Sequence, residues 1–338
     1  MKQASEQDNN PGNLNYTIVI ENLNKNFKVR QKEKGFKGLL KSIVKSEYKE
    51  IHAVNNISFS VKEGELVAFI GPNGAGKSTT LKILSGILYP DSGVVKVLGL
   101  NPQKDRKKLS FSIGTVFGQK PQLWFHLPAK DSFDLFAKIY EIPDQEYIER
   151  INALIKRFDI EDIVDQPVRK LSLGQRMRCE IVLALVHKPK ILFLDEPTIG
   201  LDIIAKKNIR ELIREINEKE NVTILLTSHD MDDVEKICKR AVIINKGIIV
   251  YDGKINDLKN NYIQKKTIKA LSESKIKFDR QKNVKILKRS EYGIKIEVDT
   301  SKNSIKEVIN YLLKNNQIID LTIEEPEIEE IIEAVYRK

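Results

Sequence analysis

A continuous apolar run at residues 66–70, followed directly by a glycine-rich loop, constrains the fold more than any other feature of the chain. The run is LVAFI, and the loop at residues 71–78 is GPNGAGKS. An apolar run without alternation is typical of a strand that is covered on both faces in a parallel sheet. The loop fits the pattern GxxxxGK[ST], which joins such a strand to a helix and binds phosphate.

This loop has the chemistry of a nucleotide site. Its glycines let backbone N–H groups turn inward around phosphate oxygens, and the N-terminus of the next helix adds positive potential. Lys77 supplies a point charge for the β- and γ-phosphates of ATP, and the hydroxyl of Ser78 can ligate Mg²⁺. The loop residues that we expect to bind the nucleotide are Gly71, Asn73, Gly74, Gly76, Lys77, Ser78 and Thr79.

Two adjacent acids follow a second buried-strand candidate at residues 191–194. In phosphate-loop ATPases the first acid after such a strand holds Mg²⁺, which assigns Asp195 to the metal. Glu196, one residue further on, is placed to orient and deprotonate the attacking water. Charged strand ends are common, but adjacent acids in a chain with a phosphate loop predict a hydrolytic site.

Strand and helix patterns alternate over most of the chain. Apolar runs at 66–70, 191–194, 222–226 and 241–244 predict buried strands, and the alternating run at 57–61 predicts a half-buried antiparallel strand. Helical patterns occur at 131–140, 145–157, 174–187, 203–217 and 230–239. This alternation predicts an α/β fold with a mostly parallel core sheet.

The pattern changes after residue 253. We expect a disordered leader over 1–15, a first domain over 16–253, a lysine-rich linker over 254–280 and a small α+β domain over 281–338. The elements expected in the small domain are strands at 284–287, 294–298 and 318–322 and helices at 304–314 and 326–336.

Positive charge is concentrated in one segment. The formal net charge is +10, and residues 28–50 contain eight lysines or arginines against three glutamates. The segment lacks the interleaved aromatic residues of a base-stacking surface. It predicts a short basic amphipathic helix that suits an anionic membrane surface or a groove on a membrane partner, or else packs on its own domain. The apolar face of that helix would consist of Phe36, Leu39, Leu40, Ile43 and Val44.

Composition excludes several classes of protein. A hydrophobic fraction of 41% and a charged fraction of 31% are ordinary for a soluble protein. The longest apolar stretches fall far short of the roughly 20 residues that a membrane-spanning helix needs. The polar N-terminus shows no secretory signal. Cys179 and Cys238 lie far apart, as expected of a reduced, cytosolic protein.

Further motifs occur in a fixed order with the phosphate loop and the strand end at Asp195. They are Gln119 in VFGQK, the sequence LSLGQ at 171–175, Gly200-Leu201-Asp202, and His229 in TSHD. Together these motifs resemble the ATP-binding cassette (ABC) ATPases, and the resemblance covers residues 16–253. It identifies the first domain as an ABC ATPase domain, with an antiparallel β subdomain and an α-helical subdomain beside the parallel core sheet.

The resemblance implies roles for these residues. Gln119 would lie near Mg²⁺ and the attacking water, and His229 would contact the γ-phosphate. The signature residues Ser172, Gly174 and Gln175 would contact the nucleotide of the opposite subunit, with Asp202 at the subunit boundary. The implied catalytic residues are Glu196, His229 and Gln119, and the implied metal ligands are Ser78, Gln119 and Asp195.

One position departs from the family pattern, and a second position of the pattern has two candidate residues in this sequence. Leu173 stands where the signature usually has glycine, and we expect activity to survive because the flanking signature residues remain. Family members stack an aromatic side chain on adenine from a strand before the core. Phe27 matches that place, and Tyr48, beyond the basic segment, is the alternative.

One signature and one phosphate loop per chain imply that a complete site needs two cassettes head to tail. The chain would therefore dimerise on ATP, as a homodimer or with a second ATPase chain, and separate after hydrolysis. The resemblance further implies separate transmembrane permease subunits and a place on the cytoplasmic face of the membrane. The aromatic loop at 119–128 and the tail resemble the exporter branch related to daunorubicin, sodium and viologen export ATPases. The alternative is a soluble ABC ATPase that acts on nucleic acid or the ribosome.

Overall fold

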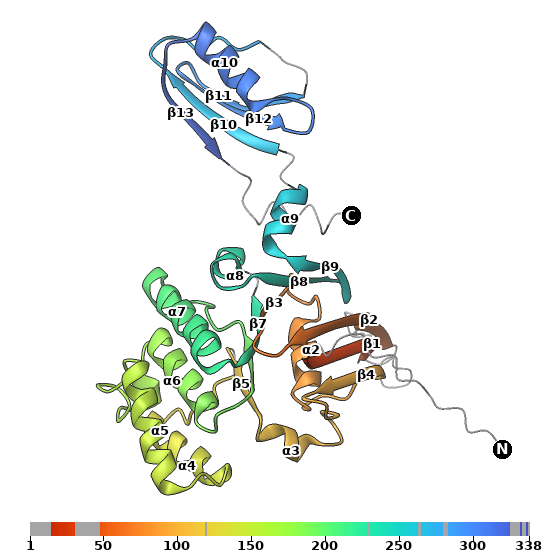
Figure 1. Cartoon of the computed structure of the whole chain (residues 1–338), viewed down its shortest axis with the longest axis vertical. Helices are drawn as coiled ribbons and strands as arrows, with labels where there is room; N and C mark the ends of the chain where they lie inside the picture. Colours follow the sequence, from red (N-terminus) through yellow and green to blue (C-terminus); the bar gives the residue numbers. More distant parts are fainter. Residues whose placement is uncertain are drawn as a thin grey trace, which may run out of the picture. The chain divides into compact units, whose positions relative to one another are not determined.

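The computed structural model describes residues 15–30, 48–118, 120–228, 230–262, 265–279 and 283–324, together with Ile332 and Tyr336. The chain divides into two compact units, Met1–Asp252 and Gly253–Lys338 (Figure 1). Among the described residues, none of the helices combines the length and the apolar character that crossing a bilayer requires.

A six-stranded sheet forms the centre of the first unit (Figure 1). In spatial order its strands are β5 (Ile113–Phe117), β6 (Ile191–Asp195), β7 (Thr223–Ser228), β3 (Leu66–Ile70), β8 (Arg240–Asn245) and β9 (Ile248–Lys254). The pairs from β5 to β8 are all parallel. Every residue of β7 is buried, which explains why these strands read as continuous apolar runs. The predicted α/β fold with a mostly parallel core sheet is confirmed.

Helices connect these strands and pack against them. In chain order they are α2 (Lys77–Leu84), α3 (Arg106–Ser110), α4 (Ala129–Ile139), α5 (Asp144–Arg157), a 3-10 turn (Val168–Lys170), α6 (Leu173–Leu185), α7 (Ile203–Glu220) and α8 (Met231–Ile237). Helix α2 packs against β2, β4 and β6, whereas α6 packs against β5, α4 and α7. The helices expected from periodicity are present, with ends shifted by a few residues.

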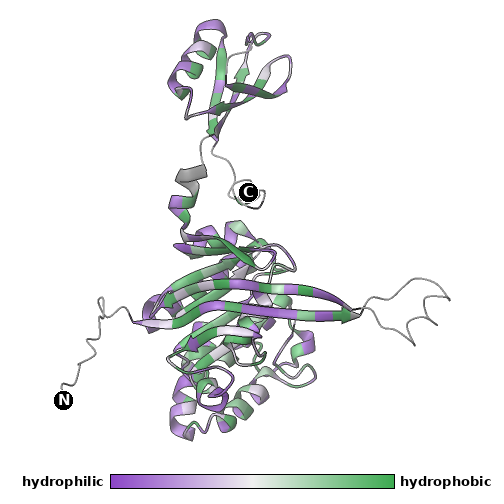
Figure 2. Cartoon of the chain, turned by 90° about the vertical axis from the view of Figure 1, so that its right-hand side faces the viewer, coloured by the Kyte–Doolittle hydropathy of each residue, from purple (hydrophilic) through white to green (hydrophobic). Residues whose placement is uncertain are grey.

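A three-stranded antiparallel sheet covers one side of the core. Its order is β2 (Tyr48–Lys62), β1 (Tyr16–Arg30), β4 (Ser92–Val97). In Figure 2, hydrophobic and hydrophilic bands alternate along the two long strands, as expected of a half-buried sheet. Its apolar face shares a core with residues of the parallel sheet such as Phe69 and Phe193. The amphipathic helix expected near 36–44 lies outside the described residues.

Strand β5 is absent from the elements predicted above. Its five residues, Ile113–Phe117, are interrupted by Gly114, which breaks the apolar run that marks the other core strands. The glycine has a packing reason, since a Cβ atom there would lie 2.5 Å from the carbonyl oxygen of Ala184 in α6. Close packing of the helix on the strand therefore explains both the residue and the missed prediction.

The described part of the second unit includes a four-stranded antiparallel sheet and two helices with defined bounds. The sheet order is β11 (Val284–Arg289), β12 (Gly293–Asp299), β10 (Lys265–Ser272), β13 (Ile318–Glu324), and the helices are α9 (Ile255–Tyr262) and α10 (Ile305–Asn315). Val308 and Leu312 of α10 share a core with Ile268 and Ile296 of the sheet. The helix expected at 326–336 lies almost entirely outside the described residues.

The expected linker over 254–280 is wrong as a description of most of that segment. It contains α9 and β10, and β10 lies between two other strands of the sheet. Ile268 and Ala270 of β10 are buried, and Lys269 between them is exposed on the opposite face of the strand. A strand with one polar face was therefore mistaken for a linker because its charged residues dominate the composition.

Candidate functional site

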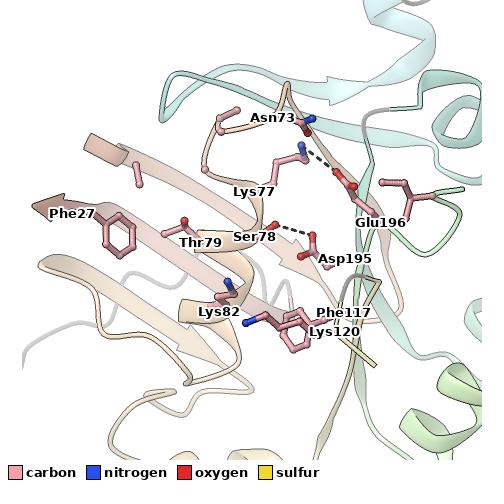
Figure 3. Close-up of a pocket in the computed structure, with 15 residues that line it drawn as sticks. Phe27, Asn73, Lys77, Ser78, Thr79, Lys82, Phe117, Lys120, Asp195 and Glu196 are labelled. Carbon is pink, nitrogen blue, oxygen red and sulfur yellow. Dashed lines mark hydrogen bonds and ion pairs between the residues drawn. The ribbon is translucent and has the colours of Figure 1, made fainter. Parts of the chain in front are cut away.

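A cavity of about 470 Å³ opens around the glycine-rich loop (Figure 3). Its walls come from β1, β2, the loop after β3, helix α2, and the segments that follow β5 and β6. The lining residues are Phe27, Ala53, Asn73, Gly74, Ala75, Gly76, Lys77, Ser78, Thr79, Lys82, Phe117, Lys120, Asp195, Glu196 and Ile199. The structure thus brings the predicted loop residues from Asn73 to Thr79, both acids and Phe27 to one cavity. Gly71 lies two residues before Asn73 and is not a lining residue.

The glycine-rich loop turns sharply into α2. Gly76 has a φ of 112°, and a Cβ atom there would lie 2.3 Å from the carbonyl oxygen of Ala53, so only glycine fits. Gly76 is also the N-cap of α2, and no side chain accepts a hydrogen bond from the first turn. The N–H groups at this helix terminus face the cavity end where an anion would bind favourably.

Lys77 is buried at the start of α2. Its ammonium donates a hydrogen bond to the carbonyl oxygen of Gly71 at 2.6 Å and lies 3.6 Å from a carboxylate oxygen of Glu196. Burial lowers the pKa of the Lys77 ammonium below its ordinary value, although Glu196 and Asp195 act in the opposite direction. A group that is costly to keep charged in a buried site gains most from an anionic ligand.

Asp195 and Ser78 meet at the base of the cavity. The Ser78 hydroxyl donates to Oδ1 of Asp195 at 3.2 Å, and the Thr227 hydroxyl donates to the same oxygen at 2.6 Å. A hydroxyl and a carboxylate side by side are the hard oxygen donors that Mg²⁺ prefers. This donor set therefore fits a magnesium ion beside a bound phosphate group.

Glu196 has an unusual backbone conformation. Its φ of 55° lies in the left-handed region, which costs a non-glycine residue roughly 1–2 kcal/mol. Its N–H donates to the carbonyl oxygen and to the hydroxyl oxygen of Thr227, each at 3.1 Å. The turn after β6 is thus held by contacts with β7, and strained residues of this kind concentrate at functional sites.

Phe27 and Tyr48 lie on opposite faces of the long hairpin. The register pairs Phe27 with Ile51 and pairs Tyr48 with Arg30, which places the two rings on different faces of the sheet. Phe27 lines the cavity and Tyr48 does not. Figure 3 shows Phe27 on one side of the cavity and Glu196 on the other, with the loop between them.

The signature residues form a separate cavity of about 340 Å³. Ser172 is the N-cap of α6 and forms a capping box with Gln175, with bonds of 3.2 Å and 2.8 Å. Gly174 and Asp202 line the same cavity, and Asp202 caps α7 through the N–H of Ala205 at 2.9 Å. This second cavity shares no lining residue with the first.

Leu173 lies at the edge of this second site. Its side chain is more than one-third exposed, and a Cβ atom on Gly200 would lie 3.1 Å from its Cδ2 atom. The residue that departs from the family pattern therefore contacts the turn before Asp202 and leaves the capping box intact.

Gln119 and His229 lie outside the described residues. Their neighbours are described: Phe117 pairs with Asp195 at the end of β5, and Ser228 ends β7. Both flanking residues lie at the edge of the sheet where the parallel strands end, which is the edge that carries Asp195.

Known proteins match a large part of this chain. A family model described as "ABC transporter" matches residues 54–199. The ABC transporter ATP-binding protein NatA of Bacillus subtilis is 35% identical over 210 residues, which cover 62% of this chain and 85% of NatA. The chain belongs to the ABC transporter ATP-binding proteins. The predicted family is confirmed, and with it ATP binding and ATP hydrolysis.

Two further similarities bear on this ABC ATPase. The Methionine import ATP-binding protein MetN of Bacillus subtilis is 34% identical and covers 65% of each chain. The dimeric structure of the cassette MJ0796 is bound to ADP and Pi in a post-hydrolysis state. It has a TM-score of 0.57 and 26% sequence identity to this chain, and the match covers 70% of this chain and 98% of MJ0796. Relatives therefore include an import protein, so the comparisons leave the direction of transport open.

Some residues of this site were not predicted from the sequence. Lys82 lies one helical turn after Ser78 and on the same face of α2, a spacing that could have indicated it. Thr227 was noted only as part of the motif around His229. Its contacts with Asp195 and Glu196 depend on how β6 and β7 pair, which the sequence does not state.

Proposed function

We propose that this ABC ATPase is the ATP-hydrolysing subunit of a membrane exporter and works on the cytoplasmic face of the membrane. One observation carries the proposal: the phosphate loop with both acids lines one cavity, and the signature residues line another. Each chain therefore supplies the phosphate-loop half of one site and the signature half of another. A head-to-tail pair of cassettes would complete both.

The first cavity suits the hydrolytic step. Loop N–H groups and Lys77 would bind the β- and γ-phosphates, and Phe27 would stack on adenine. Ser78 and Asp195 would hold Mg²⁺, which neutralises phosphate charge when it is bound. Glu196 would take a proton from water as the water oxygen bonds to the γ-phosphorus and the bond to the β–γ bridging oxygen breaks, which gives ADP and inorganic phosphate.

The second cavity suits the completion of a neighbouring site. The signature residues of one chain would contact the γ-phosphate bound to the loop of the other, with Asp202 at the boundary. Because the nucleotide then belongs to both subunits, ATP would favour the closed dimer and hydrolysis would release it. Gln119 and His229 are proposed to complete the site beside the water and the γ-phosphate.

The closing and opening of this dimer would drive separate transmembrane subunits. Two features favour the exporter branch over an importer: the resemblance of the tail and the aromatic loop at 119–128. Trp124, Phe125 and Leu127 in that loop are all at least 40% exposed, which is unusual for a purely internal role. The second unit forms an open four-stranded sheet with α10, whereas importers more often carry a barrel-shaped regulatory tail.

The basic segment at 28–50 is proposed to contact an anionic membrane surface. Deletion of residues 31–47 should weaken sedimentation with vesicles that contain phosphatidylserine and leave basal ATP hydrolysis unchanged. Equal sedimentation of both proteins would favour the alternative, in which the segment packs on its own domain.

A mild-detergent purification of the full chain tests the transporter role. We expect a polytopic membrane protein to co-purify in stoichiometric amount, with several apolar segments of about 20 residues each. Ribosomes or nucleic acid that survive a salt wash would contradict the export role and favour the alternative of a soluble ABC ATPase.

A further inference from the structure

Thr227, at the end of β7, contacts both acids of the hydrolytic site. Its side chain is completely buried. The hydroxyl donates a hydrogen bond of 2.6 Å to Oδ1 of Asp195 and accepts one of 3.1 Å from the N–H of Glu196. One hydroxyl group thus links the side chain of the first acid to the backbone of the second.

The two contacts differ in how far they depend on the hydroxyl. The N–H of Glu196 also donates to the carbonyl oxygen of Thr227 at 3.1 Å, so the turn keeps a hydrogen bond without the side chain. Two hydroxyl groups donate to Oδ1 of Asp195: that of Thr227 at 2.6 Å and that of Ser78 at 3.2 Å. If Ser78 turned to a metal ion, Thr227 would remain as the donor that orients Asp195.

We propose that the hydroxyl of Thr227 is a positioning group that orients Asp195 for Mg²⁺ and fixes Asp195 relative to Glu196. The proposal rests on the function proposed above. Groups that hydrogen-bond a metal-binding carboxylate fix its orientation, and their loss commonly reduces metal affinity or activity about 10- to 100-fold. Thr227 is not among the residues that line the cavity, so it would act through Asp195.

Thr227→Val tests this role because valine keeps the shape of the side chain and removes the hydroxyl. We expect kcat to fall at least about tenfold and the Mg²⁺ concentration for half-maximal hydrolysis to rise about tenfold. The KM for ATP at saturating Mg²⁺ should change little. Titration of Mn²⁺ by electron paramagnetic resonance, with the non-hydrolysable analogue AMPPNP bound, should show the same loss of metal affinity without turnover.

Thr223→Val on the same strand is the matched control. Thr223 is also completely buried, and its hydroxyl accepts a hydrogen bond from the N–H of Gly64 at 2.9 Å, away from both acids. This variant should lose thermal stability while its kcat and Mg²⁺ dependence stay native. Thr227→Ser keeps the hydroxyl and should recover most of the kcat and Mn²⁺ affinity.

Two results would overturn the inference. One is native kcat, Mg²⁺ dependence and Mn²⁺ affinity in Thr227→Val, and the other is equal impairment in Thr227→Ser and Thr227→Val. A native chain that hydrolyses ATP without needing a divalent metal would instead contradict the proposed site. These outcomes distinguish a failure of the role proposed for Thr227 from a failure of the proposed hydrolytic site.

Discussion

The ammonium nitrogen of Lys77 lies 3.6 Å from a carboxylate oxygen of Glu196 across the cavity. The cation proposed to bind the γ-phosphate is thus paired with the acid proposed to activate the water. An incoming phosphate group must take Lys77 from this partner. Nucleotide binding would therefore separate the carboxylate of Glu196 from the ammonium of Lys77.

Glu196→Gln should separate these two effects. Loss of the general base should lower kcat about 10²- to 10⁴-fold. The Kd for ATP should stay the same or fall, because Lys77 no longer pairs with a carboxylate. Steady-state hydrolysis and equilibrium titration with ATP measure the two quantities, and undiminished turnover would remove Glu196 from the reaction.

Phe27→Ala should weaken ATP binding. Stacking of an aromatic side chain on a base contributes about 1–3 kcal/mol, so the Kd for ATP should rise at least about fivefold. Tyr48→Ala is the control, since Tyr48 lies on the opposite face of the same hairpin. A larger loss in Tyr48→Ala than in Phe27→Ala would reverse the assignment of the stacking residue.

Ser172→Asp should separate helix capping from dimer formation. Aspartate caps helices about as well as serine, so thermal stability should be preserved. Its negative charge would repel the γ-phosphate held by a second copy, so ATP-dependent dimerisation and hydrolysis should be lost. ATP should still bind each single chain. If the variant dimerises normally on ATP, Ser172 does not face a neighbouring nucleotide.

His187 should make stability depend on pH. Its Nε2 donates to the carbonyl oxygen of Ile113 at 2.9 Å, and its ring stacks on Tyr140 with the ring centroids 3.9 Å apart. Its Nδ1 is buried and has no hydrogen-bond partner among the described residues. Burial lowers the pKa of His187 in the folded state, and Arg150 acts in the same direction. The unfolded chain binds a proton first, near an ordinary pKa of about 6.5, so stability falls as pH decreases through that value.

Thermal unfolding at pH 7.5 and pH 5.5 measures this effect. The melting temperature should fall at the lower pH, and His187→Gln should reduce the size of that fall. His52→Gln, which changes an exposed histidine, controls for the loss of a histidine in general. An identical fall in His187→Gln and the native chain would contradict the assignment to His187.

Local sequence was sufficient for the phosphate loop and for the core strands β3, β6, β7 and β8. Gly76 has a positive φ at the turn into α2, so its place in the motif follows from local backbone geometry. The strands at 66–70 and 191–194 are recognisable because burial on both faces demands apolar residues throughout.

Features that depend on distant pairing were not predictable in the same way. Thr227 lies beside Asp195 only because β6 and β7 pair in parallel with these two residues in register. Gly114 in β5 reflects close packing against Ala184 of α6, which is 70 residues away in the chain. The buried face of β10 was not predicted because the lysines of the strand dominate its composition. The first two cases depend on an element that no local window of sequence contains.

Sedimentation velocity of the Glu196→Gln chain, with and without ATP and Mg²⁺, tests the central claim most directly. The variant should bind ATP but not consume it, so the nucleotide-bound pair of cassettes should persist. We predict a monomer without nucleotide, a dimer with ATP, and a monomer with ADP. A chain that binds ATP and remains monomeric would contradict the head-to-tail site, unless a second, different ATPase chain restores the dimer when it is added.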